Sequence, residues 1–280
     1  MAMNPNDLKY VCDLVLRRSG IVLDASKEYL IEARLSMLIK RLNVPSIVEL
    51  LQQARTKKTE PAERDIVDAM TTNETSFFRD IHPFEALKKQ IMPSLLASRA
   101  AERKLNIWCA ASSTGQEPYT LAMLLKENFP QLAGWKVTFI ASDLSRDVLA
   151  KAKAGRYSQL EVNRGLPAAM MVKYFKKQGL EWEIVPDVRN MIDFREINLL
   201  GAWPLMPSLD LVFIRNVLIY FNQETKRQIL GRIRGLMRPD GFLFLGAAET
   251  TLNVDDKFER HPLENTGCYR LQSRAVAAAA

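Results

Sequence analysis

Four short segments between residues 110 and 221 combine polar residues that could bind a ligand, and each follows an apolar run. The first, residues 110–118, is rich in small residues, with one glycine, Gly115, and an acidic residue, Glu117, where a helix is expected to begin. Small residues let a backbone approach a ligand closely, but a carboxylate at a helix start repels a pyrophosphate. The segment therefore favours a cationic ligand, such as the sulfonium and ammonium groups of S-adenosylmethionine, over a dinucleotide.

The other three segments offer groups for the rest of such a ligand. Asp143 follows the second apolar run, a usual place for a carboxylate that accepts hydrogen bonds from ribose hydroxyls, although a helix cap is the alternative there. Asn198 follows the third run, and its amide could recognise an adenine edge. Asn216 and Tyr220 follow the fourth run, where Tyr220 could instead be a core aromatic with a hydrated hydroxyl. Together the four segments indicate an S-adenosylmethionine-dependent methyltransferase.

The elements that must position these residues have the alternation of an α/β fold. Short apolar runs at 105–109, 136–142, 192–197, 209–214 and 242–246 predict strands, and helical segments separate them. This order predicts a mainly parallel, Rossmann-like sheet with helices on both faces. Ligands bind beyond the carboxyl ends of such strands. The stretch from about 157 to 197 holds extra material and predicts an inserted subdomain with a small antiparallel β-sheet.

The residues before this sheet predict a separate, small all-α domain at 1–72. Apolar residues recur there near helical spacing, as at Leu35, Leu38 and Leu42. Residues 73–104 then predict a linker and a connecting helix, in which Pro93 should cause a kink or start a fresh turn. The α/β domain should span 105–273, with 274–280 as a disordered tail.

Composition excludes several other classes of protein. The chain has 280 residues, 48% of them apolar and 25% charged, as in a soluble globular protein. Three cysteines without paired spacing and two histidines predict neither a disulfide framework nor a metal site. Charged residues within the first twenty positions argue against a signal peptide or a membrane span, so we expect a cytoplasmic protein. The net charge of +7 fits an acidic partner of any kind.

Three longer motifs, TTNETSFFRD at 71–80, ASSTGQEPY at 111–119 and RNVLIYF at 215–221, resemble those of the chemotaxis receptor methyltransferase (CheR) family. The resemblance extends from about Asp7 to Leu271. It implies a class I methyltransferase that transfers a methyl group from S-adenosylmethionine to glutamate side chains of chemotaxis receptors. The products would be glutamate methyl esters and S-adenosylhomocysteine.

The resemblance also implies roles for individual residues. Asn73, Thr75 and Arg79 would cover the cofactor, and Glu117 would hold its charged amino acid end. Asp143 would bind the ribose, Asn198 and Leu199 would flank the adenine, and Asn216 and Val217 would lie beside the methionine moiety. Arg79 and Tyr220 would form the catalytic pair, and a solvated linker arginine is the alternative interpretation of Arg79. No strong base is needed, because a glutamate carboxylate, with a pKa of about 4.3, is already ionised at neutral pH.

The expected partners are the cytoplasmic methylation helices of receptors, which would recruit the enzyme to membrane receptor arrays. Residues 33–58 carry six basic residues and one acidic residue, and the resemblance makes Arg34, Lys40 and Arg41 candidates for docking, with a merely solvated helix face as the alternative. Some members bind a receptor's C-terminal tethering peptide with the inserted subdomain. The segment 176–180 looks shorter than their glycine-bearing loop, which predicts a chain that does not need the tether. Neither nucleic acid binding nor membrane insertion is expected.

Two other functions are compatible with the same fold. One is a methyltransferase of nucleic acid or of a small molecule, but residues 216–219 lack the prolines usual in base-directed amino methyltransferases. The other is a noncatalytic S-adenosylmethionine sensor, against which the presence of both Arg79 and Tyr220 argues.

Overall fold

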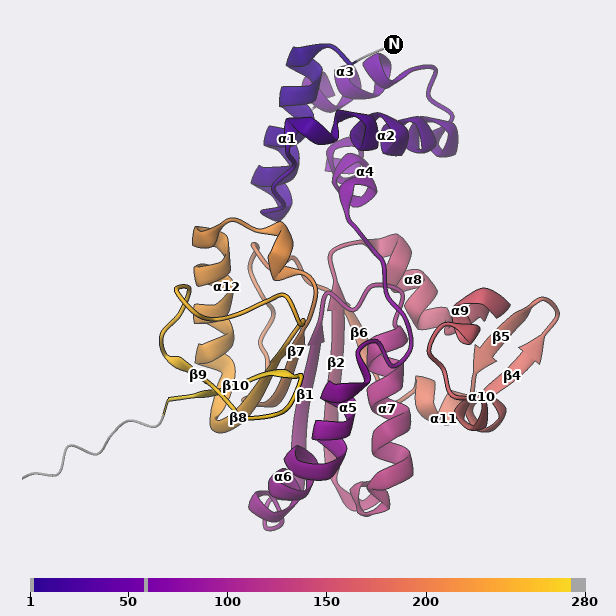
Figure 1. Ribbon diagram of the computed structural model, residues 1–280. Coiled ribbons are helices and arrows are strands. Elements are labelled where there is room, and N and C mark those ends of the chain that lie inside the picture. Colours follow the sequence, from indigo (N-terminus) through magenta and orange to yellow (C-terminus); the bar gives the residue numbers. More distant parts are fainter. Residues whose placement is uncertain (1–2, 58–59, 273–280) are drawn as a thin grey trace, which may run out of the picture.

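The computed structural model describes residues 3–57 and 60–272, which form a helical N-terminal domain above a larger α/β domain (Figure 1). The expected tail from 274 lies outside the described residues. In the N-terminal domain a core of buried aliphatic side chains, including Leu14, Ile31 and Leu35, joins the helices. These are α1 (Pro5–Ser19), α2 (Glu28–Leu42), α3 (Ile47–Lys57) and α4 (Glu60–Met70).

A seven-stranded sheet forms the centre of the α/β domain. Its strand order is β6-β2-β1-β7-β8-β10-β9, in which the first five strands run parallel, β10 pairs antiparallel with β8, and β9 pairs antiparallel with β10. All six residues of β7 are buried, as expected for a central parallel strand covered on both faces. The strands are β1 (Lys104–Ala110), β2 (Lys136–Asp143), β6 (Asp193–Glu196), β7 (Leu209–Ile214), β8 (Met237–Leu245), β9 (Phe258–Arg260) and β10 (Gly267–Leu271).

Helices cover both faces of this sheet, which confirms the predicted α/β class. One face packs against α7 (Gln116–Asn128) and the connecting helix, and the other packs against α12 (Gln223–Leu236). Successive residues of a strand point to opposite faces, so on β1 Ile107 belongs to the first core and Trp108 to the second. Helix α8 (Arg146–Ala154) follows β2 and lies beside β6.

The connecting helix changes its winding just before Pro93. Helix α5 (Ile81–Ala86) continues through a π-helical turn, η2 (Leu87–Ile91), into α6 (Met92–Ser98), and Pro93 lies in the first turn of α6. Proline has no N–H to donate to the preceding turn, and a π turn is one of the usual ways in which a helix accommodates such a break.

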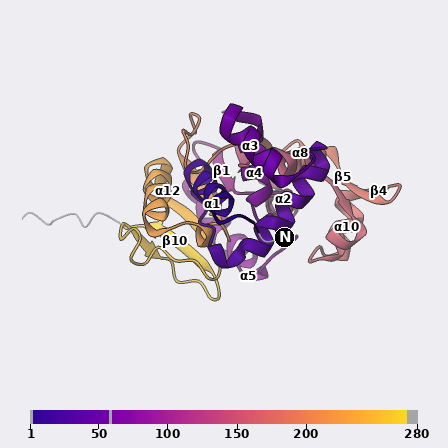
Figure 2. The same cartoon turned by 90° about the horizontal axis from the view of Figure 1, so that it is seen from above.

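The inserted subdomain is smaller than the sequence predicts. Its antiparallel sheet has the order β3-β5-β4 and projects to one side of the molecule, as the view from above shows (Figure 2). Strand β6 lies inside the expected range of 157–197, but it pairs in parallel with β2 in the main sheet. The expected range therefore overlapped the strand predicted at 192–197, which joins the main sheet as the sequence predicts, and the small sheet ends with β5. Its strands are β3 (Arg156–Ser158), β4 (Phe175–Gln178) and β5 (Glu181–Ile184).

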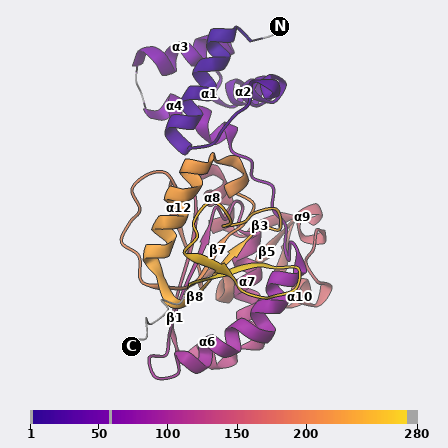
Figure 3. The ribbon, with the colours of Figure 1, turned by 60° about the vertical axis from the view of Figure 1, so that its left-hand side comes forward.

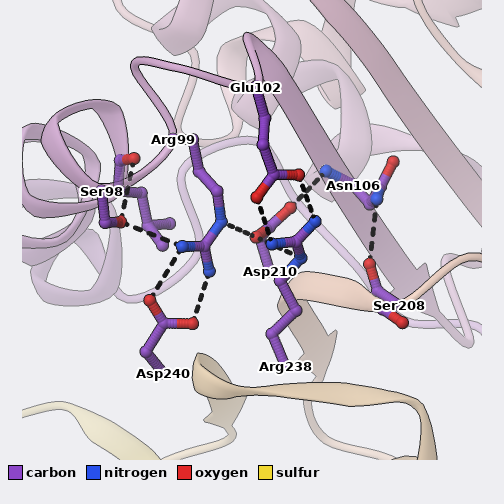
Figure 4. A network of polar contacts seen from close by, with 9 residues as sticks. Ser98, Arg99, Glu102, Asn106, Ser208, Asp210, Arg238 and Asp240 are labelled. Carbon is purple, nitrogen blue, oxygen red and sulfur yellow. Dashed lines mark hydrogen bonds and ion pairs between the residues drawn. The ribbon is translucent and has the colours of Figure 1, made fainter.

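A buried polar network fastens the amino-terminal edge of the main sheet (Figure 4). Arg99, directly after α6, donates to Asp210 on β7 at 2.7 Å and to both carboxylate oxygens of Asp240 at 2.5 and 2.8 Å. Asp210 also accepts the backbone N–H of Asn106 on β1 at 2.7 Å. Arg99 and Asp210 are 4% and 1% exposed, so their charges must be compensated within the protein, which Asp210 and Asp240 do for Arg99.

The N-terminal domain lies over the opposite, carboxyl edge of the sheet (Figures 1 and 3). The backbone N–H of Val22 donates to the carbonyl of Tyr220 at 2.9 Å, and the side chain of Asn198 donates to the carbonyl of Arg18 at 2.6 Å. Ion pairs between Arg64 and Glu196 and between Arg41 and Asp147 also cross this junction. The N-terminal domain therefore covers the edge at which the sequence predicts a ligand.

Candidate cofactor and active site

A cavity lies at the carboxyl edge of the sheet, beneath the N-terminal domain. Its walls come from the end of α1, the linker after α4, the turns after β1, β2, β6 and β7, and the 3-10 turn η4 (Leu218–Tyr220). The structure brings together here all the residues predicted for the cofactor and for catalysis: Asn73, Thr75, Arg79, Glu117, Asp143, Asn198, Leu199, Asn216, Val217 and Tyr220.

The turn after β1 brings backbone to the cavity in an unusual conformation. Ala111, Ser113 and Gly115 have φ angles of 52°, 50° and 93°, in the left-handed region. Such angles in residues other than glycine cluster at functional sites because the surrounding structure must hold them. A Cβ on Gly115 would also lie 3.0 Å from the Cβ of Ala152 and 3.1 Å from the hydroxyl of Tyr157, so helix α7 can begin here only with glycine.

Asp143 at the end of β2 stabilises two turns while it lines the cavity. Its carboxylate accepts the N–H of Ser113 at 2.8 Å and the N–H of Ser145 at 3.0 Å. Burial raises the pKa of Asp143, and these backbone hydrogen bonds oppose that rise. The residue that caps α8 is Ser145. Each carboxylate oxygen can accept a second hydrogen bond, so the local role of Asp143 leaves room for a ligand hydroxyl.

A buried arginine to which the sequence analysis gave no role connects the linker to the sheet. Arg215 at the end of β7 lines the cavity, and its side chain is 1% exposed. It donates to Glu117 at 2.5 Å, to Asp80 at 2.9 Å and to the carbonyl of Arg79 at 3.1 Å. Its place at a strand end, next to Asn216, was the available signal, but the sequence does not show that Glu117 is its partner.

The linker is fixed against the α/β domain rather than solvated. Phe77 is fully buried and packs edge-to-face on Tyr157 at a centroid distance of 5.1 Å. Phe78 has a φ of 50° and donates its N–H to the hydroxyl of Thr120 at 3.1 Å. Arg79 is half-buried and donates to the carbonyl of Glu74 at 3.1 Å. The structure thus places Arg79 at the cavity wall, with one hydrogen bond to the backbone of its own linker.

Comparison with known proteins identifies both parts of the chain. Residues 6–71 match the all-alpha domain of CheR methyltransferases, and residues 73–266 match the S-adenosylmethionine-binding domain of CheR methyltransferases. The chain belongs to the CheR methyltransferase family. Its cofactor is therefore S-adenosylmethionine, as predicted.

Curated relatives align with this CheR chain over most of their length. Chemotaxis protein methyltransferase 1 of Pseudomonas aeruginosa is 44% identical over 245 residues, which cover 86% of this chain and 88% of the relative. Chemotaxis protein methyltransferase Cher2 of Pseudomonas putida is 38% identical over the same coverage. The chemotaxis protein methyltransferase of Escherichia coli is 32% identical, covering 92% of this chain and 89% of the relative.

The groups that line the cavity of this CheR chain suit S-adenosylmethionine. Glu117, which is paired with Arg215, and Asp143 provide two carboxylates that can accept hydrogen bonds from the ammonium and hydroxyl groups of such a ligand. In the left-handed turn at 111–115 the backbone can approach a ligand in the cavity closely. Within residues 3–57 and 60–272, no cluster of three or more His, Cys, Asp or Glu side chains could hold a metal ion. None of the described helices is long and apolar enough to cross a membrane.

Asn198 has a structural role that the sequence analysis did not anticipate. Its amide nitrogen donates to the carbonyl of Arg18 at 2.6 Å, and its oxygen accepts the N–H of Leu200 at 3.0 Å. The side chain therefore connects the turn after β6 to α1. Any contact with adenine would have to share an amide that already holds the domain junction.

The predicted docking residues do not form an unengaged basic face. Arg34 donates to the carbonyl of Met70 at 2.6 Å and to the hydroxyl of Thr72 at 3.0 Å, so it holds the start of the linker. Burial lowers the pKa of Arg34. Arg41 pairs with Asp147 of the α/β domain. Lys40 is exposed on α2.

Proposed function

We propose that this chain transfers the methyl group of S-adenosylmethionine to glutamate side chains of chemotaxis receptors, giving glutamate methyl esters and S-adenosylhomocysteine. The observation that carries the proposal is the cavity in which Arg79, from the linker, and Tyr220, from η4, line the same space as the cofactor candidates. The names of the relatives, all chemotaxis protein methyltransferases, support the receptor as substrate.

The cofactor would lie across the carboxyl ends of the strands, and each of its parts would contact the residues predicted for it. Glu117 would face the ammonium, and Asp143 would accept hydrogen bonds from the ribose. Asn198 and Leu199 would flank the adenine, and Asn216 and Val217 would lie beside the methionine moiety. Asn73 and Thr75 would close the site from the linker, where the hydroxyl of Ser113 donates to the carbonyl of Asn73 at 2.7 Å.

The reaction requires the protein to align the substrate carboxylate with the methyl group, and it does not require a general base. A substrate glutamate is already ionised at neutral pH, and holding the reacting atoms in line can supply several kcal/mol. We assign Arg79 to the incoming carboxylate, because its guanidinium can donate two hydrogen bonds to one carboxylate. We assign Tyr220 to a hydrogen bond that orients the carboxylate or the methyl donor.

Receptor methylation helices would approach over α2, and this contact would recruit the enzyme to receptor arrays. Lys40 presents its charge to solvent there, whereas Arg34 and Arg41 would have to share their present contacts. Opposite charge at such a rim mainly accelerates association. The chain would therefore recognise its glutamate-rich target partly by electrostatic attraction.

We also propose that a receptor tethering peptide is not required. Strand β4 is an edge of the small sheet, and the turn between β4 and β5 consists of Gly179 and Leu180. A calorimetric titration with a C-terminal receptor pentapeptide should show no micromolar binding, with a scrambled peptide as the control. Micromolar affinity for the native peptide alone would refute this part of the proposal.

The function is tested by incubating the protein with labelled S-adenosylmethionine and receptor-containing membranes. We expect base-labile label on receptor glutamates, because carboxylate methyl esters hydrolyse in base. Label on nucleic acid or on a small molecule, or cofactor binding without any transfer, would refute the proposal in favour of the two functions left open by the sequence.

A further inference from the structure

We propose that Glu249 is a positioning residue for methyl transfer: its carboxylate holds the loop after β7 in the conformation that presents Asn216, Val217 and Tyr220 to the cavity. The inference rests on the proposed function, because that function gives these three residues their roles. Glu249 itself is not among the residues that line the cavity, so it would act only through the loop.

The carboxylate of Glu249 accepts four backbone N–H groups. One oxygen, Oε2, accepts from Asn216 at 2.8 Å and from Gly246 at 2.7 Å. The other, Oε1, accepts from Val217 at 2.9 Å and from Ile219 at 3.3 Å. Three of the four donors belong to the loop and the fourth to the end of β8, so one side chain ties the loop to its neighbouring strand.

These donors need an acceptor from outside the loop. The N–H groups at the start of a helical turn have no partner within the turn, and η4 begins directly after Val217. Glu249 is 8% exposed, so water does not easily replace it. Hydrogen bonds to an ionised carboxylate are about twice as strong as those between neutral groups, which suits this side chain to hold an irregular loop.

Gly246 leaves the space that this arrangement requires. A Cβ at that position would lie 2.8 Å from Oε2 of Glu249, 2.7 Å from Nδ2 of Asn216 and 2.9 Å from its backbone nitrogen. Asn216 has a φ of 58°, in the left-handed region, which costs a residue other than glycine on the order of 1 kcal/mol. The close packing of Gly246, Glu249 and Asn216 therefore helps to hold Asn216 in its left-handed conformation.

The test replaces the carboxylate with an amide of the same shape. Glu249→Gln keeps one acceptor oxygen and turns an NH2 group toward N–H donors. Well below its melting temperature, we expect this variant to bind S-adenosylhomocysteine at least about tenfold more weakly. Its kcat should fall on the order of 100-fold, as when reacting groups are misplaced by about 1 Å. Glu249→Asp, which keeps both oxygens on a shorter side chain, should recover part of each loss. Glu259→Gln, an exposed position on β9, is the matched control and should behave as wild type.

A folded Glu249→Gln protein with wild-type affinity and wild-type kcat would overturn the proposal, even if its melting temperature were lower. If that variant does not fold, Gly246→Ala decides, because its Cβ displaces the same carboxylate and Asn216 without removing either. It should lose affinity and turnover in the same way, and unchanged values would overturn the proposal. Binding of S-adenosylhomocysteine is measured without a receptor. A wild-type protein that binds it but methylates no receptor would therefore refute the proposed function while the role of Glu249 stays measurable.

Discussion

Asp68 on α4 should make the stability of the protein depend on pH near neutrality. Its carboxylate is partly buried at the junction between the N-terminal domain and α8, where it is close to Arg64 and to the backbone of Arg146. Burial raises the pKa of Asp68 to about 6, although Arg64 and the Arg146 hydrogen bond oppose the rise. Because this pKa exceeds the value of 3.8 for an ordinary aspartate, folding favours the protonated form. The resulting stability is fully present below pH 3.8 and is lost as the pH rises through about 6.

The difference between the two pKa values corresponds to about 3 kcal/mol, and partial exposure reduces the cost of the ionised form at neutral pH to about 1 kcal/mol. Asp68→Asn removes this charge and keeps the size of the side chain. In urea unfolding near pH 7.5, the variant should be about 1 kcal/mol more stable than wild type, and the difference should vanish near pH 4. Asp256→Asn, at an exposed position, is the control and should show no such change. A variant that is not stabilised at neutral pH, or whose advantage stays constant as the pH falls, would refute the reasoning.

Four further substitutions test the site, the sheet and the docking surface. Arg79→Ala should abolish methyl transfer while the circular dichroism spectrum and the urea midpoint stay unchanged; near-normal turnover would remove Arg79 from the catalytic pair. Asp210→Ala should lower the free energy of unfolding by about 3–5 kcal/mol, because Arg99 then stays buried without that partner. Asp240→Ala should cost clearly less, since the side chain of Asp240 is 42% exposed, and equal losses in urea unfolding would contradict this explanation. Lys40→Glu should raise the KM for receptor membranes without altering the affinity for S-adenosylhomocysteine, and a changed affinity would show that Lys40 does not act in docking.

The sequence predicts the sheet and the location of the site because both follow from local patterns. A strand buried on both faces needs a continuous apolar run, and the run at 209–214 coincides with β7. The carboxyl ends of parallel strands meet at one edge, so residues that directly follow each run, such as Asp143 and Asn216, were expected to converge. They do line one cavity. The run at 192–197 likewise marks β6, although only the four residues Asp193–Glu196 form the strand.

What the sequence does not reveal is the partner of each charged side chain. The ion pair between Arg215 and Glu117 joins residues 98 positions apart, and the contact between Arg41 and Asp147 joins residues 106 apart. A local excess of basic residues is the same whether a guanidinium meets a receptor or, like that of Arg34, holds the protein's own linker. Glu249 illustrates the same limit, because its four donors are backbone N–H groups that any residue except proline could supply. Patterns of residue type therefore locate a site, whereas tertiary structure decides which of its charges remain available to a ligand.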